Sequence, residues 1–293
     1  MKQGIIYEGS DPIAPRVTQD SIYPNISGAY TPFTYTGERL AVLNKTHDAG
    51  IASWFNFGTA QQQGLAIWDD IMVRVGNTEG GAKPCNVFRF NAQGSPVNIA
   101  STSLAGIGHG NALEFAPVLE DGQTLPYLYV AGMGDNCYVL SFDENYAPTI
   151  VQTITISTGN QMLMGDDGFI WSSAAGSGNH RRFRKYRRVA VAEGDVTLTD
   201  ADKLDDWQTM DVFPSENYTM QGWKVKFGQI WMLYGTAGTG QERGIVVYDT
   251  ATHRRVAQLV LTSLISGEPE DLDFRNNSIY IGMITGTGYS MRV

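Results

Sequence analysis

The stretch QGWKVKFGQIWMLYGTAGTGQERGIVVYDTATHRRVAQLVL, from Gln221 to Leu261, decides the fold. It contains four short runs rich in β-branched, aromatic and other apolar residues, at 223–227, 230–234, 245–249 and 255–261. Gly228-Gln229, a glycine-rich loop over 235–244 and a polar turn through Thr252 separate them. Such runs joined by turn residues predict a four-stranded antiparallel meander.

The same order of runs and turns recurs along the chain. The five units open at Gln63, His109, Gln161, Gln221 and Glu270, at spacings of 46, 52, 60 and 49 residues. The strands expected in the other units lie at 65–68, 71–75, 86–90, 97–100, 111–115, 127–130, 138–142, 149–156, 162–164, 169–171, 183–190, 207–213, 272–274, 279–281 and 289–293. A period of about 40–50 residues with four strands per unit is typical of β-propeller blades.

The fifth unit ends after its third strand, while the run 51–57 stands just before the first unit, where a fourth strand is expected. This N-terminal strand is therefore expected to complete the last blade and close the ring, so that no sheet edge is left bare. The run 39–43 is a candidate further strand of that blade. The prediction is an all-β, five-bladed β-propeller with four-stranded antiparallel blades over residues 37–293. A β-sandwich is the alternative.

Residues 1–36, rich in Pro, Tyr and Thr, have no partner in the repeat. Two interpretations stay open for this N-terminal extension, an extended arm packed on the ring or an attachment segment.

The composition of the chain argues against several classes of function. The formal net charge of -9 argues against sequence-independent nucleic-acid binding, which needs a basic surface. No apolar run approaches the roughly 20 residues of a membrane helix, and the first residues lack the apolar core of an export signal. The two cysteines, Cys85 and Cys137, are expected to be buried free thiols. The four histidines show no metal-ligand spacing, so neither a metal nor a cofactor is expected.

Propeller geometry places the residues that open the units on one face, together with the glycine-rich loops. Gln63, His109, Gln161, Gln221 and Glu270 thereby form a candidate polar mouth of the central channel, where glycine permits close approach of the backbone to a ligand. The alternative is that these side chains only hold neighbouring blades together by hydrogen bonds.

A basic run, His180 to Arg188, holds seven basic residues in nine positions. Its first residues, His180, Arg181 and Arg182, are expected on the same face, where arginine suits bidentate binding of phosphate or carboxylate. The competing interpretation is a solvated strand neutralised by the acidic residues just downstream, Asp195, Asp200, Asp202, Asp205 and Asp206.

No catalytic residue is assigned from the sequence. A glycosidase needs two carboxylates roughly 5–9.5 Å apart. The candidates are Asp69, Glu114, Asp135, Asp166, Glu268 and Glu270, but four of the five unit openings are amide or imidazole and cannot supply an acid pair. Nucleophile-elbow, zinc-protease and phosphate-loop motifs are absent from the sequence. These observations favour a binding function over a catalytic one.

The recurring Gln-Gly-hydrophobic opening, aromatic strand, glycine loop and Tyr248-Asp249 or Phe142-Asp143 strand end resemble five-bladed propellers of phage receptor-binding and teichoic-acid-associated proteins. The resemblance covers about residues 51–293. It departs from the pattern at Gln161-Met162 and Glu270-Asp271, so site residues are not carried over there. It implies a non-enzymatic virion or cell-surface module whose partner is a surface polysaccharide or a neighbouring virion protein, with oligomers possible. The alternative is a five-bladed glycoside hydrolase or lyase acting at the channel mouth.

Overall fold

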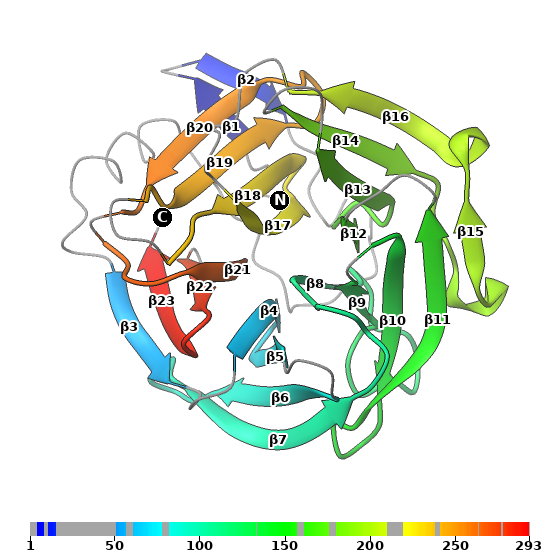
Figure 1. Cartoon of the computed structure of the whole chain (residues 1–293), viewed down its shortest axis with the longest axis vertical. Helices are drawn as coiled ribbons and strands as arrows, with labels where there is room; N and C mark the ends of the chain where they lie inside the picture. Colours follow the sequence, from blue (N-terminus) through cyan, green and yellow to red (C-terminus); the bar gives the residue numbers. More distant parts are fainter. Residues whose placement is uncertain are drawn as a thin grey trace.

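The computed structural model describes residues 5–8, 11–15, 51–56, 61–77, 82–132, 134–156, 161–175, 180–209, 219–237, 241–262, 264–276 and 278–292. Five sheets stand around a central axis, each with its first strand innermost (Figure 1). The predicted all-β five-bladed propeller is confirmed. No helix within the described ranges is long and apolar enough to cross a membrane.

The blades are numbered in chain order. Blade I consists of β4 (Gln61–Trp68), β5 (Ile71–Asn77), β6 (Lys83–Phe90) and β7 (Pro96–Leu104). Blade II consists of β8 (Ala112–Phe115), β9 (Leu128–Ala131), β10 (Asn136–Phe142) and β11 (Pro148–Ile156). Blade III consists of β12 (Gln161–Met164), β13 (Ile170–Ala175), β14 (Arg181–Tyr186) and β16 (Lys203–Gln208). Blade IV consists of β17 (Met220–Lys226), β18 (Gln229–Tyr234), β19 (Gly244–Asp249) and β20 (Arg255–Val260).

Blade V combines the two ends of the propeller sequence. It contains β21 (Pro269–Arg275), β22 (Ser278–Met283) and β23 (Thr287–Arg292), and β3 (Ile51–Asn56) pairs antiparallel with β23 as the outermost strand. The candidate strand at 39–43 lies outside the described residues. Within the N-terminal extension, β1 (Ile5–Glu8) and β2 (Asp11–Pro15) form a separate two-stranded antiparallel sheet. The domain boundary between residues 36 and 37 stays a prediction.

Blade III departs from the predicted strand limits. β14 ends at Tyr186 rather than at residue 190, and β16 begins at Lys203 rather than at residue 207. The intervening chain forms two 3-10 turns, η2 (Val191–Glu193) and η3 (Asp200–Asp202), and β15 (Val196–Leu198) between them. β15 pairs in parallel with β11, so blade II gains a fifth strand from the sequence of blade III. Residues 210–213 of the predicted fourth strand lie outside the described part.

The hydrophobic core lies between blades rather than in one central cluster. One cluster joins Trp231 and Ile245 of blade IV to Leu272 and Ile281 of blade V. Another joins blades I and II, including Val73 and Leu113. Each blade therefore depends on its neighbours for burial of its faces, as expected for a repeat architecture.

Both cysteines lie within this core as buried free thiols, as predicted. Cys85 belongs to the cluster between blades I and II, and Cys137 to a cluster that packs blade II against blade III.

Candidate functional site

The Gln-Gly openings of the repeat are β-bulges in the innermost strands. The pairing of β4 with β5 shifts across Gln63-Gly64, and the pairing of β17 with β18 shifts across Gln221-Gly222. A third shift in β21 falls at Glu270. A bulged residue is left out of the regular pairing with the neighbouring strand, so its side chain can point in another direction. All three residues lie near the beginning of an innermost strand, and therefore at one mouth of the channel. We call this end of the ring the first mouth.

The glycine of each Gln-Gly pair allows neighbouring blades to approach. The Gly64 amide donates a hydrogen bond to the Gly110 carbonyl at 2.9 Å. A Cβ at Gly64 would lie 2.4 Å from Leu113, and one at Gly222 would lie 2.3 Å from Asp271. These distances leave no room for a side chain, so the motif is required for packing of the inner strands.

At the first mouth, Gln221 connects two blades. Its Nε2 donates to the Gly235 carbonyl at 2.8 Å and to Glu268 Oε1 at 2.6 Å. The interpretation of the amides as links between blades therefore holds for this residue. Gln63 is also buried, but its Oε1 has no hydrogen-bond partner among the described residues.

Glu270 is a buried carboxyl group at this mouth, with 2% of its surface exposed. Burial is the main cause that raises its pKa to about 9, and the neighbouring Glu268 adds to the shift, although Arg74 opposes it. Arg74 itself is fully buried and donates to the Gly64 carbonyl from Nε and to the Gln63 carbonyl from Nη2, so it holds the bulge of β4. Glu270 is therefore a neutral acid at ordinary pH.

The remaining openings differ from this pattern. His109 precedes β8 and its Nδ1 is hydrogen-bonded to Oδ1 of Asn111. Gln161 begins β12 without a bulge and pairs with Ser173. Its side chain is half-buried, and the Oε1 atom is enclosed with no partner within the described ranges. The openings thus share one face, as strand direction requires, but make different local contacts.

Most of the basic run lies on β14, and its charges pair mainly with acidic residues of β16 and of the chain between β14 and β16. Arg182 makes a bidentate contact with Asp206, at 2.6 Å from Nε and 2.8 Å from Nη2. Arg187 pairs with Asp202 and Glu193, both at 2.9 Å. These contacts agree with the alternative interpretation, in which the acidic residues downstream neutralise the basic run.

The start of the run is tied to the end of β16. His180 Nδ1 is hydrogen-bonded to the Thr209 carbonyl at 2.7 Å, and the Arg181 backbone amide donates to Thr209 Oγ1 at 3.0 Å. Burial lowers the pKa of the half-buried Arg181. A role for His180, Arg181 and Arg182 in binding stays a prediction.

Sequence reasoning missed a buried ionic network across the channel. Lys224 of β17 is fully buried and donates to the Leu65 carbonyl at 2.8 Å, to the Leu113 carbonyl, and to Asp271 Oδ2 at 3.1 Å. Asp271 Oδ2 also accepts the backbone amides of Leu65 at 2.9 Å and Leu113 at 3.1 Å. The network thus joins blades I, II, IV and V.

A second layer of this network lies further along the same strands. Lys226 contacts Asp273 and lies 3.0 Å from Glu114 Oε1. Asp273 Oδ2 accepts the Ile67 amide at 2.6 Å. Lysines and aspartates two positions apart point to the same side of their strands, so both layers face the channel. The sequence signal for this network is the alternation Trp-Lys-Val-Lys at the end of β17, which places both lysines on one side of the strand.

One pocket of the described structure lies at the opposite end of the channel. Its residues come from the ends of β4, β8 and β17 and from the turn after β12. None of the predicted binding residues lines it, but Glu114 and Asp166, two of the carboxylates considered for glycoside cleavage, do. We call this end, defined by Trp68, Glu114, Asp166 and Lys226, the second mouth. The described residues contain no cluster of three or more His, Cys, Asp or Glu side chains suited to a metal ion.

Comparison with known proteins finds similarity in structure only. No family model and no curated sequence matches the chain. The tail fibre of a Staphylococcus aureus phage superimposes with a TM-score of 0.51 at 13% identity, over 84% of this chain and 53% of the fibre. A hypothetical protein from Leishmania major gives 0.51 at 8%, over 87% and 94%. A mannose phosphorylase from Leishmania mexicana gives 0.49 at 10%, over 87% and 92%.

The chain spans about half the length of the phage fibre that it matches. At identities of 13% and 8%, the likenesses to the phage fibre and to the Leishmania major protein show the fold alone. What the comparisons and the geometry establish together is a five-bladed β-propeller, of a fold that a phage tail fibre also contains.

Proposed function

We propose that this protein is a non-enzymatic binding module of a virion or cell surface, and that its first mouth binds a neutral glycan. One observation carries the proposal. The first mouth contains enclosed polar groups with unused hydrogen-bonding capacity, namely Oε1 of Gln63 and of Gln161 within the described structure, and it also contains the neutral acid Glu270. Sugar hydroxyls both donate and accept hydrogen bonds, so they complement such a set.

A neutral ligand fits better than an anionic one. Arg182 and Arg187 already contact carboxylates at 2.6–2.9 Å. An anionic ligand would have to displace these contacts, which are charge-assisted and bidentate at Arg182. At the mouth itself, Glu270 is protonated below its pKa of about 9 and contributes a donor without a negative charge.

The virion assignment is supported by the shared fold with a phage tail fibre and by the sequence resemblance to receptor-binding propellers. In such an assembly the ligand would be a polysaccharide of the host surface. A neighbouring virion protein is the other occupant to test.

A glycan array with fluorescently labelled protein tests the proposal. Gln63→Ala combined with Gln161→Ala should weaken binding of array hits about tenfold or more, since each lost hydrogen bond is worth about 1 kcal/mol. Arg181→Ala combined with Arg182→Ala is the matched control and should leave binding of a neutral glycan unchanged. Loss of binding in the arginine variant alone would place the ligand on the basic run and refute the neutral-glycan proposal.

A second candidate, a glycoside hydrolase or lyase at the same mouth, is favoured by one observation. Glu270 is a carboxyl group with a strongly raised pKa, and the neighbouring Glu268 contributes to the shift. A neutral acid beside a second carboxylate is the arrangement of a general acid in glycoside cleavage. Chromatography of incubated array hits separates the two functions. Products that disappear in Glu270→Gln, while the glycan still binds, would establish the enzyme.

A further inference from the structure

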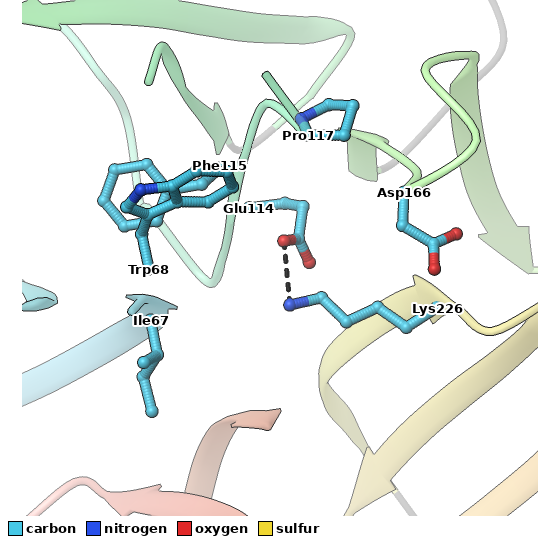
Figure 2. A pocket seen from close by; sticks show the side chains of 7 residues that line it. All are labelled: Ile67, Trp68, Glu114, Phe115, Pro117, Asp166 and Lys226. Carbon is cyan, nitrogen blue, oxygen red and sulfur yellow. Dashed lines mark ion pairs between the residues drawn. The ribbon is translucent and has the colours of Figure 1, made fainter. Parts of the chain in front are cut away.

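The second mouth holds a small pocket that is partly open to solvent. Figure 2 shows the side chains of Glu114 and Lys226 pointing toward each other, with Trp68 and Phe115 on one side and Asp166 on the other. The pocket is separated from the first mouth by the buried layer of Lys224 and Asp271, both fully buried. Whatever binds here is therefore independent of the proposed function of the first mouth.

One wall of the pocket is apolar. Ile67 and Trp68 end β4, and Phe115 ends β8 with Pro117 two residues beyond. Ile67, Phe115 and Pro117 are buried, whereas Trp68 is partly exposed. A partly exposed tryptophan beside a hollow offers a flat apolar surface that a ligand can cover, with an indole N–H at its edge.

The opposite wall is polar and incompletely satisfied. Glu114 is 3% exposed, and its Oε1 lies 3.0 Å from Lys226 Nζ, as the dashed line in Figure 2 shows. Its other oxygen, Oε2, is enclosed with no hydrogen-bond partner among the described atoms. An unpaired buried polar atom costs about 1–3 kcal/mol, which a donor from a ligand would recover.

The charges around Glu114 disfavour an ionic ligand. Lys226 is shared between Glu114 and Asp273. Asp166 Oδ2 accepts the Phe227 amide at 2.6 Å. Burial is the main cause that raises the pKa of Glu114 to about 8, so this carboxyl group is largely protonated at neutral pH. A hydroxyl group suits such a carboxyl, because each can donate or accept.

We propose that the second mouth is a further carbohydrate site, which takes one neutral pyranose ring. The ring packs against Trp68, and one hydroxyl group hydrogen-bonds to Oε2 of Glu114. Pockets of this kind combine an apolar wall with a few fixed polar groups. The propeller would then bind sugar at both ends of its channel, and a surface that presents many copies of a glycan would be held with avidity.

Titration of the full chain labelled with ¹⁵N in the tryptophan indoles tests this site. D-glucose, D-galactose and N-acetyl-D-glucosamine are added separately to about 50 mM, because a small site is expected to bind in the millimolar range. Trp68→Phe identifies the Trp68 signal. At least one sugar should shift this signal in a saturable way. If none of the three moves it, the site does not exist.

Two variants locate the contact. Glu114→Met keeps an unbranched side chain of similar length and should weaken sugar binding about threefold to tenfold, as expected for one hydrogen bond. Trp68→Ala should abolish magnetisation transfer from the protein to that sugar. Unchanged binding in either variant would overturn the proposal. Gln63→Ala with Gln161→Ala, which alters only the first mouth, should leave the Trp68 shift intact, so failure of one site is distinguishable from failure of the other.

Discussion

Replacing Lys224 tests whether the buried ionic layer holds the ring together. Lys224→Met keeps an unbranched side chain but removes the ammonium group that contacts two backbone carbonyls and lies 3.1 Å from Asp271 Oδ2. Because the carboxylate left behind is fully buried, we expect a loss of about 3–5 kcal/mol in the free energy of unfolding. Folded domains are stable by only about 5–15 kcal/mol, so the variant should remain folded but marginal.

Urea denaturation followed by tryptophan fluorescence measures this loss. With a slope of about 2–3 kcal/mol per molar urea, the midpoint should fall by about 1–2 M. Arg89→Met is the control, because Arg89 pairs with Asp70 at 3.3 Å with side chains 51% and 43% exposed. Such a pair contributes at most about 1 kcal/mol. The reasoning is refuted if Lys224→Met costs no more than Arg89→Met.

The pH dependence gives a second readout of the same variant. Burial raises the pKa of Asp271 to about 6 even though Lys224 opposes the shift, and loss of Lys224 must raise it further. A carboxyl group with a raised pKa in the fold favours folding when it is protonated. The deficit of Lys224→Met should therefore shrink as the pH falls from about 8 to about 5. A deficit that grows on acidification would contradict this.

Three further outcomes are expected. Gly222→Ala places a Cβ 2.3 Å from a carboxylate oxygen of the next inner strand and should cost about 3 kcal/mol in urea denaturation, whereas Gly94→Ala, in open space at a φ of +76°, should cost about 1 kcal/mol. Cys85 and Cys137 should resist thiol reagents in the native protein and react as two thiols after denaturation, since burial raises both pKa values, that of Cys85 to about 12. Glu270→Gln should raise the urea midpoint increasingly as the pH rises above about 4.5, where the carboxyl of the unfolded chain ionises, so its effect should be much larger at about pH 10 than at about pH 4; an equal effect at both would exclude the pKa of about 9.

The blade pattern was predictable because it depends on local sequence. In blade IV the expected runs 223–227, 230–234, 245–249 and 255–261 match β17 to β20 within three residues at each end. Alternating apolar residues and turn glycines act within a few positions of the chain. β15 was missed because three residues with no partner in the repeat form a strand only by pairing with another blade.

The candidate sites were harder to predict, for a physical reason. Lys224 resembles a solvated lysine in the sequence, and only the bulge at the start of β17 determines which of its neighbours faces the channel. A shift of one position would turn the whole strand over. The second mouth combines Trp68, Glu114 and Asp166 from three blades, and no spacing along the chain indicates that they meet.

At the bulges of the first mouth, one residue is fixed by packing and the residue before it is not. The glycine in Gln63-Gly64 or Gln221-Gly222 is fixed by the neighbouring strand, whereas the residue before it is released from the ladder. The openings already differ, with glutamine, histidine and glutamate in equivalent places. The residue before the glycine can therefore change while the ring is preserved. Positions 63 and 221, each followed by a glycine that packing requires, are therefore the places where this scaffold can be varied to engineer new binders.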